Sequence, residues 1–187
     1  MDSIISMGQK YLSGQSGGGG GSSGGFDFSS LASLAQQHDT QGSGDSDLFG
    51  NAASFLQNND QNPDDVDEDE MSQHEQKVNQ GGQAHSTEIG NAAAVSSIKN
   101  MLSGGGLGGM LGGSSGDSSS SGGGMQQKIV SMAMAQAAAL FDQKQANGEV
   151  TGGDKQSAVN SAGSAATKLM LKYGAGGNMG VLASKFM

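Results

Sequence analysis

The sequence predicts an all-α fold, a small helical bundle of six to eight short Ala/Met-rich helices with disordered Gly/Ser-rich linkers. Three observations predict this class. Apolar residues recur every three to four positions in several segments, which is the spacing of one face of a helix. The 187 residues include 11 Met and a single Pro, and Met and Ala favour helices. Aromatic residues make up only 4% of the chain, so a β-sandwich would lack its preferred residues.

The composition divides the chain into five segments. We expect a short amphipathic helix over 1–14, a Gly/Ser linker over 15–25, an acidic helical region over 26–102, a second Gly/Ser linker over 103–124, and an Ala/Met-rich helical region over 125–187. The two helical regions are expected to pack together, because neither has enough large apolar residues to build a generous core alone.

The first helices follow from short apolar stripes. Ile4, Met7 and Tyr11 predict the N-terminal helix, which the glycines after Leu12 end. Two further stripes lie at 31–38 and 48–56, and the turn between them ends in residues that commonly cap helices. These two segments therefore predict a helical hairpin.

The next helix is predicted from its start. Asn62 can cap a helix, Pro63 suits the first helical position, and carboxylates after it favour the positive end of the helix dipole. The acidic cluster at 64–70 is thus expected to stabilise a helix that runs to about Gln80. Two alternatives stay open for this cluster, a docking site for a basic partner and a divalent-ion site.

The remaining helices are predicted over 86–102 and 125–146, and a further long helix is predicted from the apolar face that extends over 159–173. The helix at 125–146 has the longest stripe, and its Ile129–Leu140 face is either a core seam with 154–173 or a surface for self-association. The core seam is favoured, because Gln136 is the only polar residue on that face. Asn147 and Gly148 are expected to end this helix in a left-handed cap. A short last helix is predicted over about 179–187.

Charge limits the classes of partner. The net charge is −9, the chain has nine Lys and no Arg, and six of the seven residues at 64–70 are acidic. Nucleic acids and anionic substrates need a cationic surface, so we expect neither as a partner. Most of the acidic residues lie in 1–100, whereas 101–187 is slightly basic, so the two halves can attract each other within one chain or between chains, although exposed pairs are individually weak.

The chain also has no Cys, which excludes disulfides and thiolate metal sites. The N-terminal residues lack the pattern of a secretory signal, and no apolar run is long enough for a transmembrane segment. We expect a soluble intracellular protein that is cytoplasmic, with a nuclear location left open.

Motif searches yield no catalytic residues and no cofactor. The G-x-S-x-G matches, among them those at Ser16, Ser22 and Ser114, have no preceding strand and lie in Gly/Ser repeats. The segment 143–154 resembles a calcium loop but has Gln where that loop needs acidic ligands, so a plain helical hairpin is expected. The residues that stay open as metal ligands are Asp64, Asp65, Asp67, Glu68, Asn147 and Asp154.

Several short segments resemble a group of fungal proteins known as beta-flanking proteins. They include Ala35-Gln36-Gln37-His38, Gly44-Asp45-Ser46-Asp47-Leu48-Phe49, Leu140-Phe141-Asp142-Gln143 and Leu182-Ala183-Ser184-Lys185-Phe186. Those proteins are described by a domain of unknown function. The resemblance implies a fungal, intracellular protein and supplies no catalytic residues.

The sequence therefore predicts a non-enzymatic helical interaction or stress-associated protein. It would act through self-association or through an unknown protein partner. The alternative is a divalent-cation-responsive binding module that uses the acidic cluster at 64–70 or the calcium-like loop at 143–154.

Overall fold

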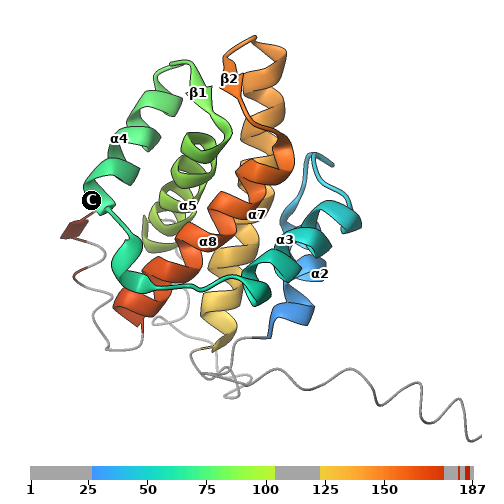
Figure 1. Cartoon of the computed structure of the whole chain (residues 1–187), viewed down its shortest axis with the longest axis vertical. Helices are drawn as coiled ribbons and strands as arrows, with labels where there is room; N and C mark the ends of the chain where they lie inside the picture. The colour runs from blue at the N-terminus through green and yellow to red at the C-terminus, as the bar shows by residue number, and fades with distance from the viewer. Residues whose placement is uncertain (1–26, 104–122, 175–180, 182–183, 186–187) are drawn as a thin grey trace, which may run out of the picture.

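The computed structural model describes residues 27–103, 123–174, 181 and 184–185. These residues form six α-helices, one 3-10 turn and one pair of very short strands (Figure 1). The prediction of an all-α fold is therefore confirmed. The helix predicted over 1–14, the linker over 15–25, nearly all of the linker over 103–124 and most of the last predicted helix lie outside the described residues.

The predicted helical hairpin is present as α2 (Phe28–His38) and α3 (Ser46–Asn58). Asp45 caps α3, because its carboxylate accepts a hydrogen bond from the Leu48 amide at 2.7 Å. Leu31 of α2 and Phe49 of α3 are fully buried. The hairpin uses them to cover the core, with α2 against α7 and α3 against α8.

The acidic stretch differs from the prediction, because it does not form one continuous helix from Pro63. A 3-10 turn η1 (Pro63–Asp65) is capped by Asn62, and the α-helix α4 (Glu68–Asn79) begins three residues later. Between them Val66 is extended and only 8% exposed, so the helix is broken in a way that buries this side chain. Asp67 then caps α4 by accepting the Glu70 amide N–H at 3.0 Å.

Three helices form the centre of the bundle, α5 (Ser86–Ser103), α7 (Gly123–Ala146) and α8 (Lys155–Gly174). All three helices pack against one another, and about half of the residues that they place in the main apolar cluster are alanines. A Cβ atom at Gly90 would lie 2.5 Å from the Ala158 carbonyl oxygen and 2.6 Å from the Ser161 Cβ. Gly90 therefore lies where the backbones of α5 and α8 approach closely.

The helix α7 is buried more completely than the single apolar face predicted for it. Val130, Met134 and Ala138 are fully buried although they lie outside the predicted stripe, whereas Leu140 within the stripe is only partly buried. The reason is that α2, α5 and α8 all pack against α7. A helix enclosed on several sides needs apolar residues around most of its circumference.

A helix–strand–helix arrangement occurs twice among the described residues. In the first unit α4 leads through β1 (Ala84–His85) to α5, and in the second α7 leads through β2 (Val150–Gly152) to α8. The two strands pair in parallel, with Ala84 opposite Val150 (Figure 1). The sequence pattern does not predict this pair.

The first helix of each unit ends in the same kind of cap. Gly81 after α4 and Gly148 after α7 have left-handed φ angles of 79° and 70°. Such positions favour glycine, and the left-handed cap predicted at Gly148 is confirmed. The cap hydrogen bonds run from the Gly82 amide to the Lys77 carbonyl at 2.9 Å and from the Glu149 amide to the Lys144 carbonyl at 2.8 Å.

Candidate functional site

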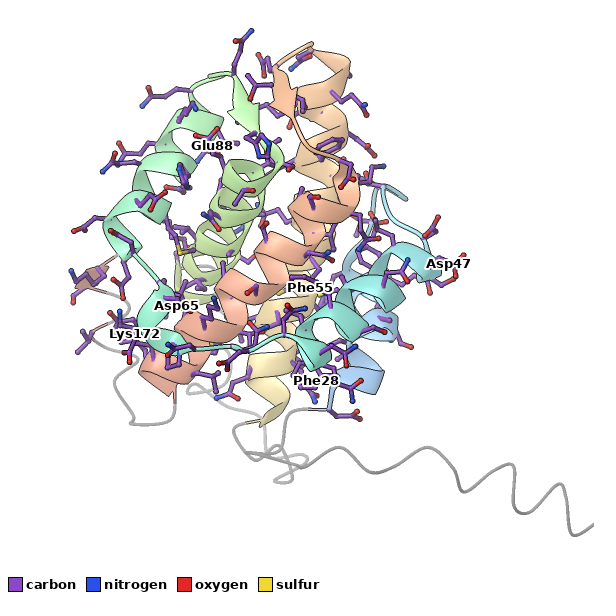
Figure 2. The ribbon with its side chains drawn as sticks, viewed as in Figure 1. Phe28, Asp47, Phe55, Asp65, Glu88 and Lys172 are labelled. Carbon is purple, nitrogen blue, oxygen red and sulfur yellow. The ribbon has the colours of Figure 1, made fainter. Side chains whose placement is uncertain are left out.

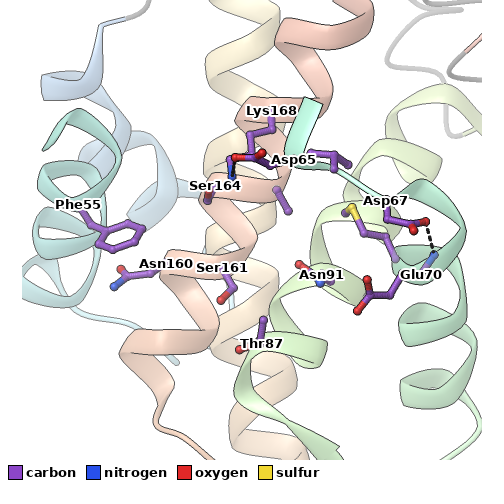
Figure 3. Close-up of a pocket in the computed structure, with 13 residues that line it drawn as sticks. Phe55, Asp65, Asp67, Glu70, Thr87, Asn91, Asn160, Ser161, Ser164 and Lys168 are labelled. Atoms are coloured by element: carbon purple, nitrogen blue, oxygen red, sulfur yellow. Dashed lines mark hydrogen bonds and ion pairs between the residues drawn. The ribbon is translucent and has the colours of Figure 1, made fainter. Parts of the chain in front are cut away.

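A cleft of about 260 Å³ lies between α4, α5 and α8, with α3 at its edge (Figure 3). The residues that line it come from five separate elements and from both helix–strand–helix units. Its apolar surface consists of Phe55, Val66, Met71 and Ala165. All of the other lining residues are polar or charged, so the chemistry of the cleft depends on them.

Amides and hydroxyls form one side of the cleft. From α8 it receives Asn160, Ser161 and Ser164, and Ser164 shares a face with the other two because it lies three residues after Ser161 and four after Asn160. From α5 it receives Thr87 and Asn91, which are four residues apart and share a face for the same reason. Figure 3 shows these residues arranged around the same hollow.

Internal hydrogen bonds use only part of this polar surface. The side-chain oxygen Oδ1 of Asn160 accepts a hydrogen bond from Gln156 Nε2 at 2.9 Å, and the Ser164 hydroxyl donates to Gln61 Oε1 at 2.9 Å. The Ser161 hydroxyl makes no hydrogen bond to any other residue that the structure describes. The cleft thus retains hydrogen-bonding groups that a ligand can use.

Three carboxylates and one cation border the cleft. Asp65, Asp67 and Glu70 line it from η1 and α4, and Lys168 lines it from α8. Lys168 approaches Asp65 at 3.7 Å, and His74 Nε2 lies 3.7 Å from the Glu70 carboxylate, whereas Asp67 has no ion pair with any other residue that the structure describes. The electrostatic field at this border is therefore negative, which favours a cationic ligand.

An ion pair connects the first residue of α4, next to the acidic border, to α8. The Glu68 carboxylate accepts hydrogen bonds from Lys172 Nζ at 2.7 Å and from the Tyr173 hydroxyl at 2.6 Å. Figure 2 shows Lys172 close to the segment that includes Asp65. This contact joins the acidic first half of the protein to the more basic second half, as the uneven division of charge predicts.

The contact with Lys172 and Tyr173 lowers the pKa of Glu68. Partial burial would raise the pKa, but the hydrogen bonds from Lys172 and Tyr173 outweigh burial and lower the pKa from 4.5 to about 2. Folded Glu68 therefore binds its proton more weakly than unfolded Glu68. The resulting stabilisation is fully present above pH 4.5 and is lost as the pH falls from 4.5 to about 2.

We predict that Glu68→Gln lowers the free energy of unfolding by about 3 kcal/mol at neutral pH, since one pKa unit corresponds to about 1.4 kcal/mol. Urea unfolding across a pH series should show this gap closing between pH 4.5 and about 2. Asp69→Asn is the control, because Asp69 is exposed and has no ion pair with any other described residue. A gap for Glu68→Gln that stayed constant with pH would contradict the assignment.

The six candidate metal ligands from the sequence lie in two separate places. Asp64, Asp65, Asp67 and Glu68 lie in and next to η1, whereas Asn147 and Asp154 lie at the opposite end of the bundle, where α7 connects to α8 (Figure 1). Among the described residues, no three His, Cys, Asp or Glu side chains are grouped so that they could hold a metal ion. The sequence candidates Ser16, Ser22 and Ser114 lie outside the described residues.

The carboxylates of the calcium-like loop at 143–154 are engaged by the protein itself. Glu149 pairs with Lys144 at 2.8 Å, and Lys144 is only 4% exposed. At the start of α8 Ser157 lowers the pKa of Asp154, first through a hydrogen bond from its side chain and second through its amide N–H, which donates to Asp154 at 2.6 Å. The loop also includes β2. It is thus a capped connection between two helices, as the sequence predicts.

Sequence reasoning missed the polar residues of the cleft. Asn91 and Asn160 have no special motif around them, but each is the sixth residue of the second helix in its helix–strand–helix unit. Glu75-Gln76-Lys77 in α4 and Asp142-Gln143-Lys144 in α7 also correspond. From the lysine of each triplet to the asparagine there are 14 residues in the first unit and 16 in the second, so a comparison of the sequence with itself aligns the two asparagines only with a gap of two residues.

The fold and the cleft define the class of protein, a helical protein with an acidic cleft that offers hydrogen-bonding groups. Comparisons with known proteins give one match. Residues 27–106 match the family model described as "Domain of unknown function (DUF7721)", which covers less than half of the sequence. No curated protein and no solved structure matches. The similar region spans α2 to α5 and includes the acidic side of the cleft.

None of the helices that the structure describes has both the length and the hydropathy that a bilayer span requires. The resemblance to fungal beta-flanking proteins finds no counterpart in these comparisons and stays a prediction.

Proposed function

We propose that this protein is a non-enzymatic binding protein whose cleft holds a lysine or arginine side chain from a basic segment of a partner protein. The observation that supports the proposal most is the combination of the negative border with the partly unused amides and hydroxyls inside the cleft. The carboxylates of Asp67 and Glu70 would attract the cationic group. The amide oxygen of Asn91 and the Ser161 hydroxyl would accept its N–H donors.

The size of the cleft supports a side chain as the ligand. A volume of about 260 Å³ is below the usual range of pockets for drug-sized molecules, which is roughly 300–1,000 Å³. The apolar surface of Met71 and Ala165 would contact the methylene groups of a long basic side chain while its charged end reaches the border.

The hydroxyls of the cleft support binding rather than catalysis. Ser164 donates to an amide, and Thr87 approaches His85 Nδ1 at 3.4 Å. Within the described residues, no carboxylate orients the imidazole of His85 toward Thr87. A nucleophile needs a base that is itself positioned, and these contacts do not supply one.

We predict that a fluorescent peptide of alternating Arg and Gly binds the full-length protein, and that Asp67→Asn with Glu70→Gln weakens it at least tenfold. A hydrogen bond to a charged group contributes about 1.5–3 kcal/mol, and about 1.4 kcal/mol corresponds to tenfold in affinity. Asn at position 67 still caps α4, so the helix should remain intact. Fluorescence anisotropy measures the affinity, and a Glu/Gly peptide is the negative probe.

The matched control is Asp45→Asn with Asp47→Asn. It removes the same number of charges and keeps the cap of α3, and Figure 2 shows Asp47 on the other side of the molecule from Asp65. Thr87→Tyr is a second test, since it narrows the cleft without changing its charge. If both double variants weakened peptide binding equally, the peptide would be attracted by the overall negative charge of the protein and not held in the cleft. A protein that is dimeric by light scattering without peptide would favour self-association instead.

A further inference from the structure

Asn147 and Gly148 form the only Asn-Gly pair in the sequence, and they lie in the turn that ends α7. Both residues are exposed, so water reaches them. A Cβ atom at Gly148 would meet nothing within 4 Å, which shows that the space around its backbone is open. The backbone nitrogen of a glycine also has no neighbouring side chain to shield it from attacking the preceding residue.

We propose that Asn147 is a site of spontaneous deamidation, in which the Gly148 backbone nitrogen attacks Cγ of Asn147. A bond forms between this nitrogen and Cγ, the bond between Cγ and Nδ2 of Asn147 breaks, and ammonia leaves with the proton from the Gly148 nitrogen. Water then opens the cyclic imide at either carbonyl and leaves aspartate or isoaspartate. Water is the only co-reactant, and nothing is oxidised or reduced.

One hydrogen bond of the turn has to open before the attack. The Gly148 amide donates to the Gln145 carbonyl at 3.1 Å, within the last turn of α7. Helix ends open locally more readily than helix centres, and this bond is at the solvent-facing end of the bundle. The reaction therefore needs local opening of the turn, not unfolding of the protein.

The product would disturb the charges around Lys144. This buried ammonium pairs with Glu149 and also donates to the Gly82 carbonyl at 3.0 Å. Hydrogen bonds from Lys144 first, and from Asn147 as a smaller cause, lower the pKa of Glu149. Deamidation removes the donor of Asn147 and adds a second carboxylate two residues from Glu149. A single lysine would then face two anions.

The isoaspartate product would also lengthen the backbone by one methylene group three residues before β2 begins. The Ala84 amide donates to the Glu149 carbonyl at 2.9 Å, and Ala84 is paired with Val150. These contacts connect the two helix–strand–helix units beside a small apolar cluster that includes Val78 and Phe141. We infer that deamidation loosens this end of the bundle, an effect that is independent of ligand binding in the cleft.

The modification is tested on the full-length protein incubated at mildly alkaline pH. Cleavage after lysine releases the segment 145–155, which includes Asn147, and the segment 156–168, which includes Asn160 as an internal reference. Mass spectrometry should show conversion at Asn147 ahead of every other asparagine, and fragmentation should detect isoaspartate. The Asn147→Gln variant should show no conversion at this position, because the longer glutamine side chain forms a less favourable ring. Conversion at Asn160 ahead of Asn147 would overturn the assignment.

The structural consequence is tested separately by amide hydrogen exchange at Ala84. Exchange at Ala84 should be faster in the incubated protein and in Asn147→Asp than in fresh protein, and unchanged in Asn147→Gln. Unchanged exchange in fully converted protein would overturn the inferred loosening while leaving the modification in place.

Discussion

Replacing Phe49 by alanine is expected to lower the free energy of unfolding by about 3–5 kcal/mol, the usual loss for a large buried aromatic side chain. Phe49 is fully buried in the main apolar cluster, and its ring covers Gly44 in the turn before α3. A small domain has a total stability of about 5–15 kcal/mol. The variant should therefore be partly unfolded at physiological temperature, as measured by urea unfolding followed by circular dichroism.

Phe55→Ala is the matched control for this prediction. Phe55 lies in the same helix but is 37% exposed at the edge of the cleft. We expect a loss of less than about 1 kcal/mol, since substitutions at exposed positions usually have small effects. Equal losses for the two variants would show that α3 is not packed in the orientation described.

Gly90→Ala is expected to destabilise the protein by about 1–3 kcal/mol, although alanine is the better helix former. The added methyl group would lie 2.5 Å from the Ala158 carbonyl oxygen. Because this neighbour is a backbone atom, it cannot rotate away, and α5 and α8 would have to move apart. Thermal melting with a urea series measures the loss.

Gly50→Ala gives the opposite sign in the same experiment. Gly50 lies within α3, and a Cβ atom there would meet nothing within 4 Å. The gain in helix propensity should then stabilise the protein by about 0.5–1 kcal/mol. If Gly90→Ala also stabilised the protein, the close crossing of α5 and α8 would be wrong.

The helices could be predicted from the sequence because their stripes and caps are local. The hairpin of α2 and α3, the start of α5 at Ser86 and the end of α7 at Gly148 all follow from residues within a few positions of each other. The start of α4 could not be predicted, because burial of Val66 against distant residues decides where the helix breaks. The strands are too short for a period of two residues to be recognised.

The cleft could be predicted only in part. Its acidic border is recognisable as an unusual local composition at 64–70, and docking of a basic partner is one of the interpretations that this composition leaves open. Asn160 and Ser161 are ordinary residues of a helix that lies far along the sequence. These residues line the cleft only because α8 packs beside α4 and α5, and local sequence patterns do not predict which helices pack together.

The parallel pairing of β1 with β2 also constrains the order in which the protein folds. Ala84 and Val150 are distant in sequence, and the glycine-rich stretch at 104–122 lies between them. A contact that closes a long loop forms late, because the chain loses the conformational entropy of the loop before the contact contributes any favourable energy. The pairs α4–α5 and α7–α8 are close in sequence and can form early. The strand pair then joins two preformed halves, and folding speed depends on how fast those halves meet.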